Sequence, residues 1–283
     1  MKVGFIGAGL MAQALCRGFI GSALVRPTQI LASDVNRGKL RAMRELGVET
    51  TLSNTDVVRD NEIVILAVKP YIVGKVLREV APMVHKNSLI VSVAAGITLA
   101  SMENILPPKT RVVRVMPNTP AIVQSGASVY TLGTSANGED SDLVTEMLNC
   151  VGLVEQMPEY LMDAVTGLSG NGPAYGYVII QALADGGVKM GLNRDQSTRL
   201  AAQLLLGSAK MVLETKGHPE ALKDQVCSPG GTSAHALHQM EKAGLRSALI
   251  DGVEAGTKRS KEIGKEYAYL DLGHKEESDD GNK

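Results

Sequence analysis

The start of the chain constrains the fold most, because a short apolar run enters a glycine-rich turn and leaves it as a helix. Residues 3–6 form the strand-like run, and Gly7 permits the tight turn that follows. Gly9 lets the backbone approach a pyrophosphate, and Ala12 lets the helix pack closely on the strand. The first turn of that helix has unpaired N–H groups and a positive dipole end, which favour phosphate. The pattern predicts a dinucleotide site; the alternative is an ordinary strand-turn-helix rich in small residues.

The first half of the chain alternates short β-branched runs with helical stretches, which is typical of a parallel sheet covered by helices. Some runs, such as residues 63–68, are apolar on both faces, as in strands buried on both sides. We therefore expect an α/β fold whose N-terminal domain, residues 1–158, is a Rossmann-type doubly wound sheet. The expected strands are residues 3–6, 29–32, 62–68, 89–93, 111–116, 128–131 and 153–156.

The second half has long helical patterns interrupted by glycine and no strand signal. Pro173 suits the first turn of a helix whose circumference is mostly apolar, so this helix needs cover on nearly all sides. A second subunit would supply that cover. We expect an all-helical substrate-binding and dimerisation domain over residues 159–265, followed by a polar, disordered tail over residues 266–283.

Charge and cysteine content argue against several classes of partner. The 283 residues carry 29 basic and 30 acidic side chains and 3% aromatics, so neither nucleic acid nor an anionic membrane is an expected partner. Cys16, Cys150 and Cys227 lack a Cys-x-x-Cys spacing, which indicates neither a disulfide framework nor a zinc site. His235 and His238 share a helix face without a further ligand at zinc spacing, so no metal is expected. We expect a cytoplasmic protein, with the mitochondrion as the alternative.

Ligands of an open parallel sheet bind beyond the carboxyl ends of its strands, so the residues that follow each strand are candidate contacts. Asp34 suits the two ribose hydroxyls of NAD, whereas Ser33, Asn36 and Arg37 suit the additional phosphate of NADP. The alternative for Asn36 and Arg37 is a solvated turn. Lys69 precedes a proline at a strand end, which favours a site over an ordinary surface lysine. The small residues that leave room for a nicotinamide ring are Ala94, Ala95 and Gly96.

A second candidate site lies in the helical half, where residues 228–233 lead into a helix. Free backbone N–H groups and the hydroxyls of Thr232 and Ser233 would face an anion there, and a small carboxylate fits such a pocket. The alternative is an ordinary helix start capped by Thr or Ser. Asp163, Thr166 and Ser169 occupy a glycine-rich segment in which hydroxyls serve either as caps or as substrate contacts, and spacing alone does not choose.

Six motifs stand together in an order that is far more specific than any one glycine turn. They are residues 4–9 (GFIGAG), 67–70 (AVKP), 94–96 (AAG), 116–120 (MPNTP), 167–175 (GLSGNGPAY) and 222–232 (LKDQVCSPGGT). With these motifs the chain resembles the pyrroline-5-carboxylate reductases over residues 3–263. The resemblance implies reduction of 1-pyrroline-5-carboxylate to L-proline, the last step of proline biosynthesis, with NADPH or NADH as hydride donor.

The resemblance also implies roles for residues at the matching positions. The implied cofactor contacts are Ile6, Gly7, Ala8, Gly9, Leu10, Met11, Ser33, Asp34, Asn54, Val68, Lys69, Ala94 and Ala95. The implied substrate contacts are Glu159, Gly230, Gly231, Thr232 and Ser233, and Thr166 is the candidate catalytic residue, as proton donor or orienter. A helical domain interlocked with a second subunit would place each substrate pocket near the dimer interface, and dimers would assemble into a larger homo-oligomer such as a decamer.

Three positions depart from the family pattern. Gln225 stands where some members have asparagine, Asn171 where serine is usual, and Asp34 where many have serine or threonine. Because a carboxylate repels a 2′-phosphate, Asp34 opposes the usual preference for NADPH. The sequence leaves the choice between NADH and NADPH open.

Two other functions also fit a dinucleotide fold joined to helices. A β-hydroxy-acid dehydrogenase takes a proton from an alcohol, usually with a lysine of the helical domain, and Lys189, Lys210 and Lys223 are available. That function leaves residues 228–232 unexplained. A redox sensor would hold the dinucleotide without turnover. Consumption of NAD(P)H in the presence of the imine separates the three functions.

Overall fold

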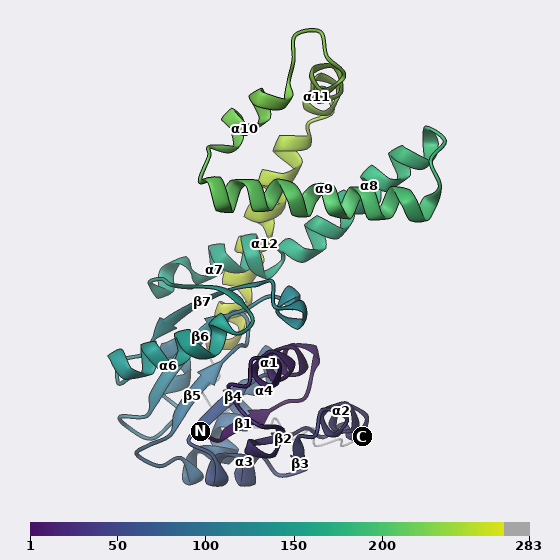
Figure 1. The fold of residues 1–283 in the computed structure, drawn as a ribbon. Helices are drawn as coiled ribbons and strands as arrows, with labels where there is room; N and C mark the ends of the chain where they lie inside the picture. Colours follow the sequence, from purple (N-terminus) through teal and green to yellow (C-terminus); the bar gives the residue numbers. More distant parts are fainter. Residues whose placement is uncertain (269–283) are drawn as a thin grey trace, which may run out of the picture. The chain divides into compact units, whose positions relative to one another are not determined.

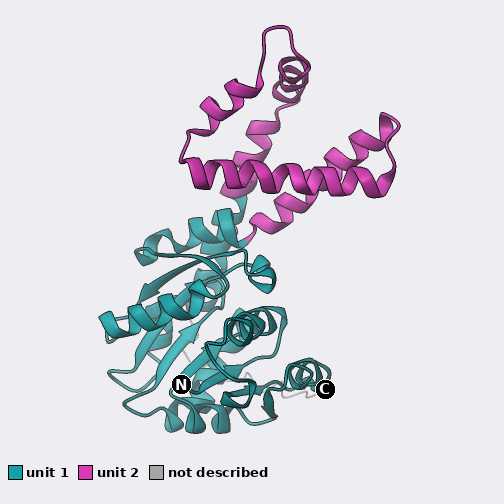
Figure 2. Ribbon diagram, in the orientation of Figure 1, with its two compact units in different colours: residues 1–170, 255–283 teal, residues 171–254 magenta. Residues whose placement is uncertain are grey.

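The computed structural model describes residues 1–268 of the 283-residue chain. Contacts divide the chain into two compact units: unit 1 comprises residues 1–170 and 255–283, and unit 2 comprises residues 171–254 (Figure 2). The expected domains, residues 1–158 and 159–265, are not these units and stay a prediction. Of the expected tail, residues 266–268 end a helix, and the remainder lies outside the described residues.

Unit 1 is built on an eight-stranded sheet with the strand order β3-β2-β1-β4-β5-β6-β7-β8 (Figure 1). The expected α/β fold with an N-terminal Rossmann-type sheet is confirmed. β1 pairs in parallel with both β2 and β4, so the glycine turn leaves the middle of the parallel part of the sheet. The strands are β1 (Val3–Ile6), β2 (Ile30–Ser33), β3 (Glu49–Thr51), β4 (Ile63–Leu66), β5 (Leu89–Ser92), β6 (Arg111–Met116), β7 (Gly126–Leu132) and β8 (Gly152–Gln156).

Two features of the sheet differ from the sequence expectation. The edge strand β3 was not expected, and it is only 3 residues long. The direction of β7 was not foreseen either, because β7 runs antiparallel to β6 and β8 runs parallel to β7. The segment between β6 and β7 contains a short 3₁₀ helix, η3 (Thr119–Val123), and is too short for the crossover that a parallel pair needs.

Successive strand residues alternate between two apolar clusters, one on each face of the sheet. Helices therefore cover both faces. In β4, Ile63 and Ile65 belong to the first cluster, whereas Val64 and Leu66 belong to the second. The first cluster includes residues of α1 (Leu10–Gly21), α2 (Arg37–Arg44) and α6 (Gly138–Asn149). The second includes residues of α3 (Asn54–Asp60), α4 (Pro70–Val80) and α5 (Leu99–Glu103).

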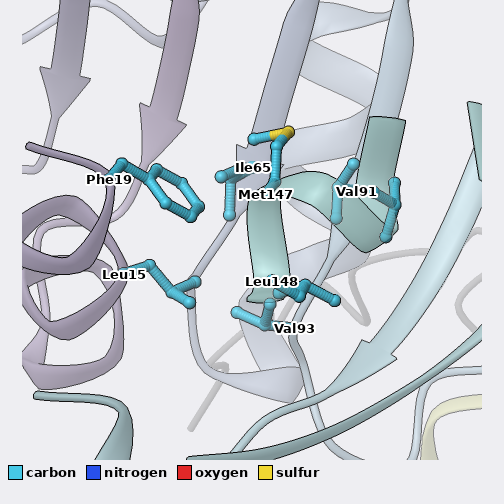
Figure 3. Close-up of a pocket in the computed structure, with 8 residues that line it drawn as sticks. Leu15, Phe19, Ile65, Val91, Val93, Met147 and Leu148 are labelled. Carbon is cyan, nitrogen blue, oxygen red and sulfur yellow. The ribbon is translucent and has the colours of Figure 1, made fainter. Parts of the chain in front are cut away.

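A small apolar cavity remains in the first cluster, between α1, α6 and the sheet (Figure 3). Its free volume is about 10 Å³. The lining side chains are Leu15, Phe19, Ile65, Val91, Val93, Val144, Met147 and Leu148. The wall atoms lose dispersion contacts on the side of this small void.

After β8 the chain forms three consecutive helical segments: η4 (Glu159–Leu161), α7 (Met162–Val165) and a π-helical turn, η5 (Thr166–Gly170). Such π-turns are rare and are frequent at functional sites. The last helix, α12 (Leu245–Ala268), begins in unit 2, and its residues 255–268 belong to unit 1.

Unit 2 consists of helices and their connections, as expected for the second half of the chain. Its helices are α8 (Gly172–Lys189), α9 (Arg194–Thr215), α10 (Pro219–Val226), α11 (Thr232–Lys242) and the first part of α12. Between residues 171 and 254 only Ala184, Ser197 and Ala201 are buried. Long apolar side chains of α9 are exposed instead, namely Leu200, Leu204, Leu206, Met211 and Leu213. One chain alone therefore gives this unit no closed apolar core.

Candidate functional site

The glycine turn after β1 has the geometry that the sequence predicts. Gly7 has a φ of +99°, and its N–H donates to the Ser33 carbonyl at 2.8 Å. A Cβ at Gly7 would lie 2.5 Å from the Ala67 carbonyl oxygen, so a side chain is excluded there. A Cβ at Gly9 would meet nothing within 4 Å, and no side chain caps α1, which begins immediately after Gly9. The first N–H groups of α1 therefore face open space, which suits a phosphate.

The Asp34 carboxylate, which follows β2, is tied to this turn. Its Oδ2 accepts the Ala8 N–H at 3.0 Å, and its Oδ1 accepts the Asn36 N–H at 2.8 Å. The Lys39 ammonium lies 3.6 Å from Oδ2, and the Asp34 side chain is 9% exposed. Asp34 therefore holds the glycine turn as well as standing at the ribose end of the expected site, and its contact with ribose stays a prediction.

Polar side chains next to Asp34 form a chain of hydrogen bonds. The Ser33 hydroxyl donates to Asn54 Oδ1 at 2.7 Å, and Asn54 Nδ2 donates to Glu79 Oε2 at 3.1 Å. Asn36 caps α2, since its Oδ1 accepts the N–H groups of Gly38 and Lys39. Asn36 thus acts as a helix cap, and its contact with a phosphate stays a prediction. Glu79 was missed from the sequence, because only the fold brings α4 next to Asn54.

The remaining expected cofactor residues follow β4 and β5. Lys69 is exposed and stands immediately before Pro70, the first residue of α4. Ala94 is buried, and Ala95 and Val68 are half-buried. Because β1, β2, β4 and β5 are mutually parallel, all the expected cofactor residues that follow them lie along one edge of the sheet. The structure thus brings this group together.

Thr166 opens the π-helical turn and is 7% exposed. Its hydroxyl donates to the Met162 carbonyl at 2.8 Å, which commits the proton and leaves the oxygen lone pairs to accept. Asn118 braces the same turn, because its Nδ2 donates to the Ser169 carbonyl at 3.1 Å. The Ser169 hydroxyl itself donates to the Val165 carbonyl at 3.2 Å, so it serves as a local helix contact.

A buried guanidinium lies beside α7. Arg114, in β6, is 2% exposed, and its Nη1 donates to Glu159 Oε1 at 3.0 Å. The same Glu159 oxygen accepts the Leu99 N–H at 2.8 Å, and Asp163 Oδ1 lies 3.8 Å from Arg114 Nη2. Glu159 thus braces the start of α5, and its expected contact with substrate stays a prediction. Arg114 was missed, although a charged residue inside the apolar run of β6 was the available signal.

The expected anion loop of unit 2 has a backbone start without a side-chain cap. Gly230 has a φ of +70°, and the Gly231 N–H donates to the Ser228 carbonyl at 3.0 Å. Gly231 is the N-cap of α11, and no side chain caps this helix. The alternative of an ordinary Thr or Ser cap is therefore wrong. The N–H groups of Thr232 and Ser233, in the first turn of α11, are available to an anion.

The surroundings of Lys223 and Cys16 do not favour catalysis by either side chain. Lys223 pairs with Glu220, whose hydrogen bond raises the pKa of the ammonium, the opposite of what a catalytic base needs. All three cysteines are free, and burial raises the pKa of the Cys16 thiol to about 12.

Across residues 1–268, no group of three or more His, Cys, Asp and Glu side chains is placed to hold a metal. No helix in that same range is long and apolar enough to cross a membrane.

Comparison with known proteins gives a consistent set of relatives. A family model described as pyrroline-5-carboxylate reductase dimerisation matches residues 159–263, and one described as NADP oxidoreductase coenzyme F420-dependent matches residues 2–96. The chain is 47% identical over 268 residues to human pyrroline-5-carboxylate reductase 2, covering 93% of this chain and 84% of that protein. It is 46% identical over 265 residues to pyrroline-5-carboxylate reductase of Methanosarcina acetivorans, covering 93% of this chain and 98% of the relative.

A solved structure extends this likeness to the fold. The pyrroline carboxylate reductase of Plasmodium falciparum, crystallised with NADP bound, superposes with a TM-score of 0.87 at 32% identity. The match covers 93% of this chain and 98% of the other. The likeness spans both compact units.

Proposed function

This chain belongs to the pyrroline-5-carboxylate reductase family, and on that premise we propose that it reduces 1-pyrroline-5-carboxylate to L-proline, the final step of proline biosynthesis. It is an NAD(P)H-dependent oxidoreductase that acts on a C=N bond. The observation that carries the proposal is the identity of 46–47% to named reductases along 93% of the chain. The alternatives, a β-hydroxy-acid dehydrogenase and a sensor without turnover, are not favoured.

The residues at the sheet edge fit a nicotinamide dinucleotide. The open space at Gly9 and the uncapped start of α1 would take the pyrophosphate. Ser33, Asp34 and Asn54 would meet the ribose at the adenosine end, and Ala94 and Ala95 would leave room for the nicotinamide. The further contacts proposed are Ile6, Gly7, Ala8, Leu10, Met11, Val68 and Lys69. When bound, the dinucleotide supplies a hydride.

We propose substrate contacts in two separate segments, the start of α11 in unit 2 and the π-helical turn in unit 1. The N–H groups of Thr232 and Ser233, with Gly230 and Gly231 as the loop, would hold the substrate carboxylate at the positive end of α11. The Thr166 hydroxyl donates to its own helix, so it would accept a hydrogen bond from the N–H of a protonated imine. Reduction of the C=N carbon would turn the protonated imine into a neutral ring amine that still carries an N–H, so the Thr166 oxygen would keep its hydrogen bond to the product. Thr166 thus orients a substrate that arrives already protonated. Glu159 is the further proposed substrate contact.

The direct test is steady-state kinetics with 1-pyrroline-5-carboxylate and each of NADH and NADPH. We expect NAD(P)H consumption with both, accompanied by stoichiometric L-proline. A β-hydroxy acid with NAD⁺ is the control substrate for the dehydrogenase alternative. Turnover of the hydroxy acid alone, or binding of NADH without consumption, would contradict the proposal.

The protein is a homo-oligomer, because its helical segment matches the dimerisation model of the family and one chain leaves apolar residues of α9 exposed. We propose that dimers assemble further into a decamer, which light scattering of the purified protein tests.

A cytoplasmic location is also proposed. Three free cysteines fit a reducing compartment. Fractionation of cells that express the full chain separates cytosol from mitochondrion.

A further inference from the structure

The end of α12 belongs to unit 1 and packs one of its faces against the rest of that unit. Ser260, Ile263, Gly264 and Tyr267 follow the i, i+3, i+4, i+7 spacing that places side chains on one side of a helix. These four residues, here called the α12 stripe, are buried or half-buried, whereas Lys261 beside them is exposed. Tyr267 packs against the second apolar cluster and so anchors the end of the stripe.

Ser260 contacts the helix that leads to Thr166. It is 2% exposed, and its hydroxyl donates to Asp163 Oδ1 at 2.7 Å. Asp163 lies in α7, three residues before Thr166, and the Thr166 hydroxyl bonds the Met162 carbonyl of the same helix. A hydroxyl nearly a hundred residues away in the sequence therefore fixes the turn on which Thr166 stands.

Ile263 and Gly264 contact the loop that follows β5. Gly96 has a φ of +77°, and a Cβ there would lie 2.6 Å from Ile263 Cγ2. A Cβ at Gly264 would lie 2.9 Å from the Gly96 carbonyl oxygen. The two backbones thus approach so closely that both positions require glycine. The loop they fix includes Ala94 and Ala95, the proposed nicotinamide contacts.

We propose that the α12 stripe acts as a rigid spacer. It sets the distance between the nicotinamide loop, residues 94–96, and α7, which leads to Thr166. Ser260 and Gly264 are positioning residues, because they act through Asp163 and Gly96 respectively. The inference rests on the proposed roles of that loop and of Thr166. Hydride transfer depends steeply on the placement of the two reacting groups, so a small shift of either element slows it.

The test compares Ser260→Ala and Gly264→Ala in the full-length enzyme, with Ser260→Thr as the variant that keeps the hydroxyl. Lys261→Ala is the control for Ser260, because this exposed side chain is on the same helix. Gly138→Ala is the control for Gly264, since a Cβ there meets nothing within 4 Å and the residue begins α6 of the same unit. Arg114 is left unchanged, because its removal would leave the carboxylates of Glu159 and Asp163 without this cationic partner.

Three readouts separate positioning from loss of folded protein: kcat with the imine, NADH affinity by fluorescence, and the kinetic isotope effect with NADH deuterated at C4. We expect kcat to fall roughly tenfold to a hundredfold in Ser260→Ala and Gly264→Ala. The isotope effect should rise in both, because hydride transfer becomes the slow step, and NADH affinity should stay within about threefold. Ser260→Thr and both controls should resemble the unaltered enzyme.

An unchanged isotope effect in both variants would contradict the proposed spacing role of the α12 stripe. This holds whether kcat is unchanged or falls because a smaller fraction of the protein is folded. That outcome is distinct from failure of the proposed function, in which the unaltered enzyme itself would not reduce the imine.

Discussion

At the scale of single residues, Thr166 shows how local hydrogen bonding selects a chemical role. A hydroxyl has one proton, and in this structure the proton is directed at the Met162 carbonyl at 2.8 Å. The oxygen can therefore accept from a protonated imine but cannot at once donate to a neutral one. This geometry favours orientation of the substrate over proton donation, the two roles left open by the sequence.

Replacing Thr166 tests that role. We expect Thr166→Ala to lower kcat roughly tenfold to a hundredfold, the range for a lost hydrogen bond to a charged group. Thr166→Ser keeps the hydroxyl and should retain most of the activity. Affinity for NADH, measured by fluorescence, should be the same in both. Equal turnover in the alanine variant and the unaltered enzyme would remove Thr166 from the mechanism.

Asp34 makes a second prediction at this scale, about cofactor choice. In the proposed site its carboxylate lies where a 2′-phosphate would bring further negative charge, and like charges about 4 Å apart repel by roughly 1 kcal/mol or more even in water. We expect Asp34→Asn to raise kcat/KM with NADPH relative to NADH by about fivefold or more. The amide oxygen can still accept the Ala8 N–H and so keep the glycine turn.

The matched control is Asp142→Asn, which removes the same charge from an exposed position of α6. Steady-state kinetics with both dinucleotides should leave its ratio unchanged. A ratio that stays constant in Asp34→Asn as well would show that Asp34 serves only the turn.

At the scale of elements, the sequence predicted what is encoded locally. The continuous apolar runs of β4 and β5 are recognisable because strands buried on both faces need no polar alternation. β3 was missed because Glu49, Thr50 and Thr51 form a short polar run at the sheet edge. The direction of β7 was also missed, since it depends on the connection after β6 rather than on the strand's own residues.

The site divides in the same way. The glycine turn and the loop before α11 are local features, so their residues could be predicted from spacing. The contacts of Arg114 with Glu159 and Asp163, and of Asp163 with Ser260, join segments far apart in the chain. No periodicity records which strand position faces which helix, and these contacts therefore required the fold.

Packing of α1 gives a prediction at the element scale. Leu15 is 1% exposed and lines the apolar cavity (Figure 3), so Leu15→Ala would enlarge a void that already exists. We expect a loss of about 2–5 kcal/mol in the free energy of unfolding. Leu10→Ala is the same change on the same helix at a residue that is 74% exposed, and it should alter stability by less than about 0.5 kcal/mol.

Urea denaturation at one fixed protomer concentration measures both variants, since association contributes to the apparent stability of an oligomer. Similar midpoints for Leu15→Ala and Leu10→Ala would contradict the packing assigned to α1.

At the scale of the whole molecule, the exposed apolar residues of unit 2 connect folding with assembly. Leu200, Leu204 and Met211 are spaced by four and seven residues along α9 and share one face of it. Gln203, Lys210 and Glu214 have the same spacing on a neighbouring polar face. A stripe of large apolar side chains beside a polar stripe is typical of a helix that is covered by another subunit.

Leu204→Glu tests this arrangement, with Gln203→Glu as the control that adds the same charge to the polar face. Burial of one leucine contributes about 1.5–3 kcal/mol, so its replacement by a charged group should weaken subunit association at least about tenfold. We expect light scattering to show a smaller particle for Leu204→Glu, and activity to fall on dilution, because each substrate pocket is expected near the dimer interface. Gln203→Glu should keep the mass of the unaltered protein. If Leu204→Glu keeps that mass at every concentration, this face of α9 does not hold the subunits together, and the cover for unit 2 must come from another of its exposed apolar surfaces.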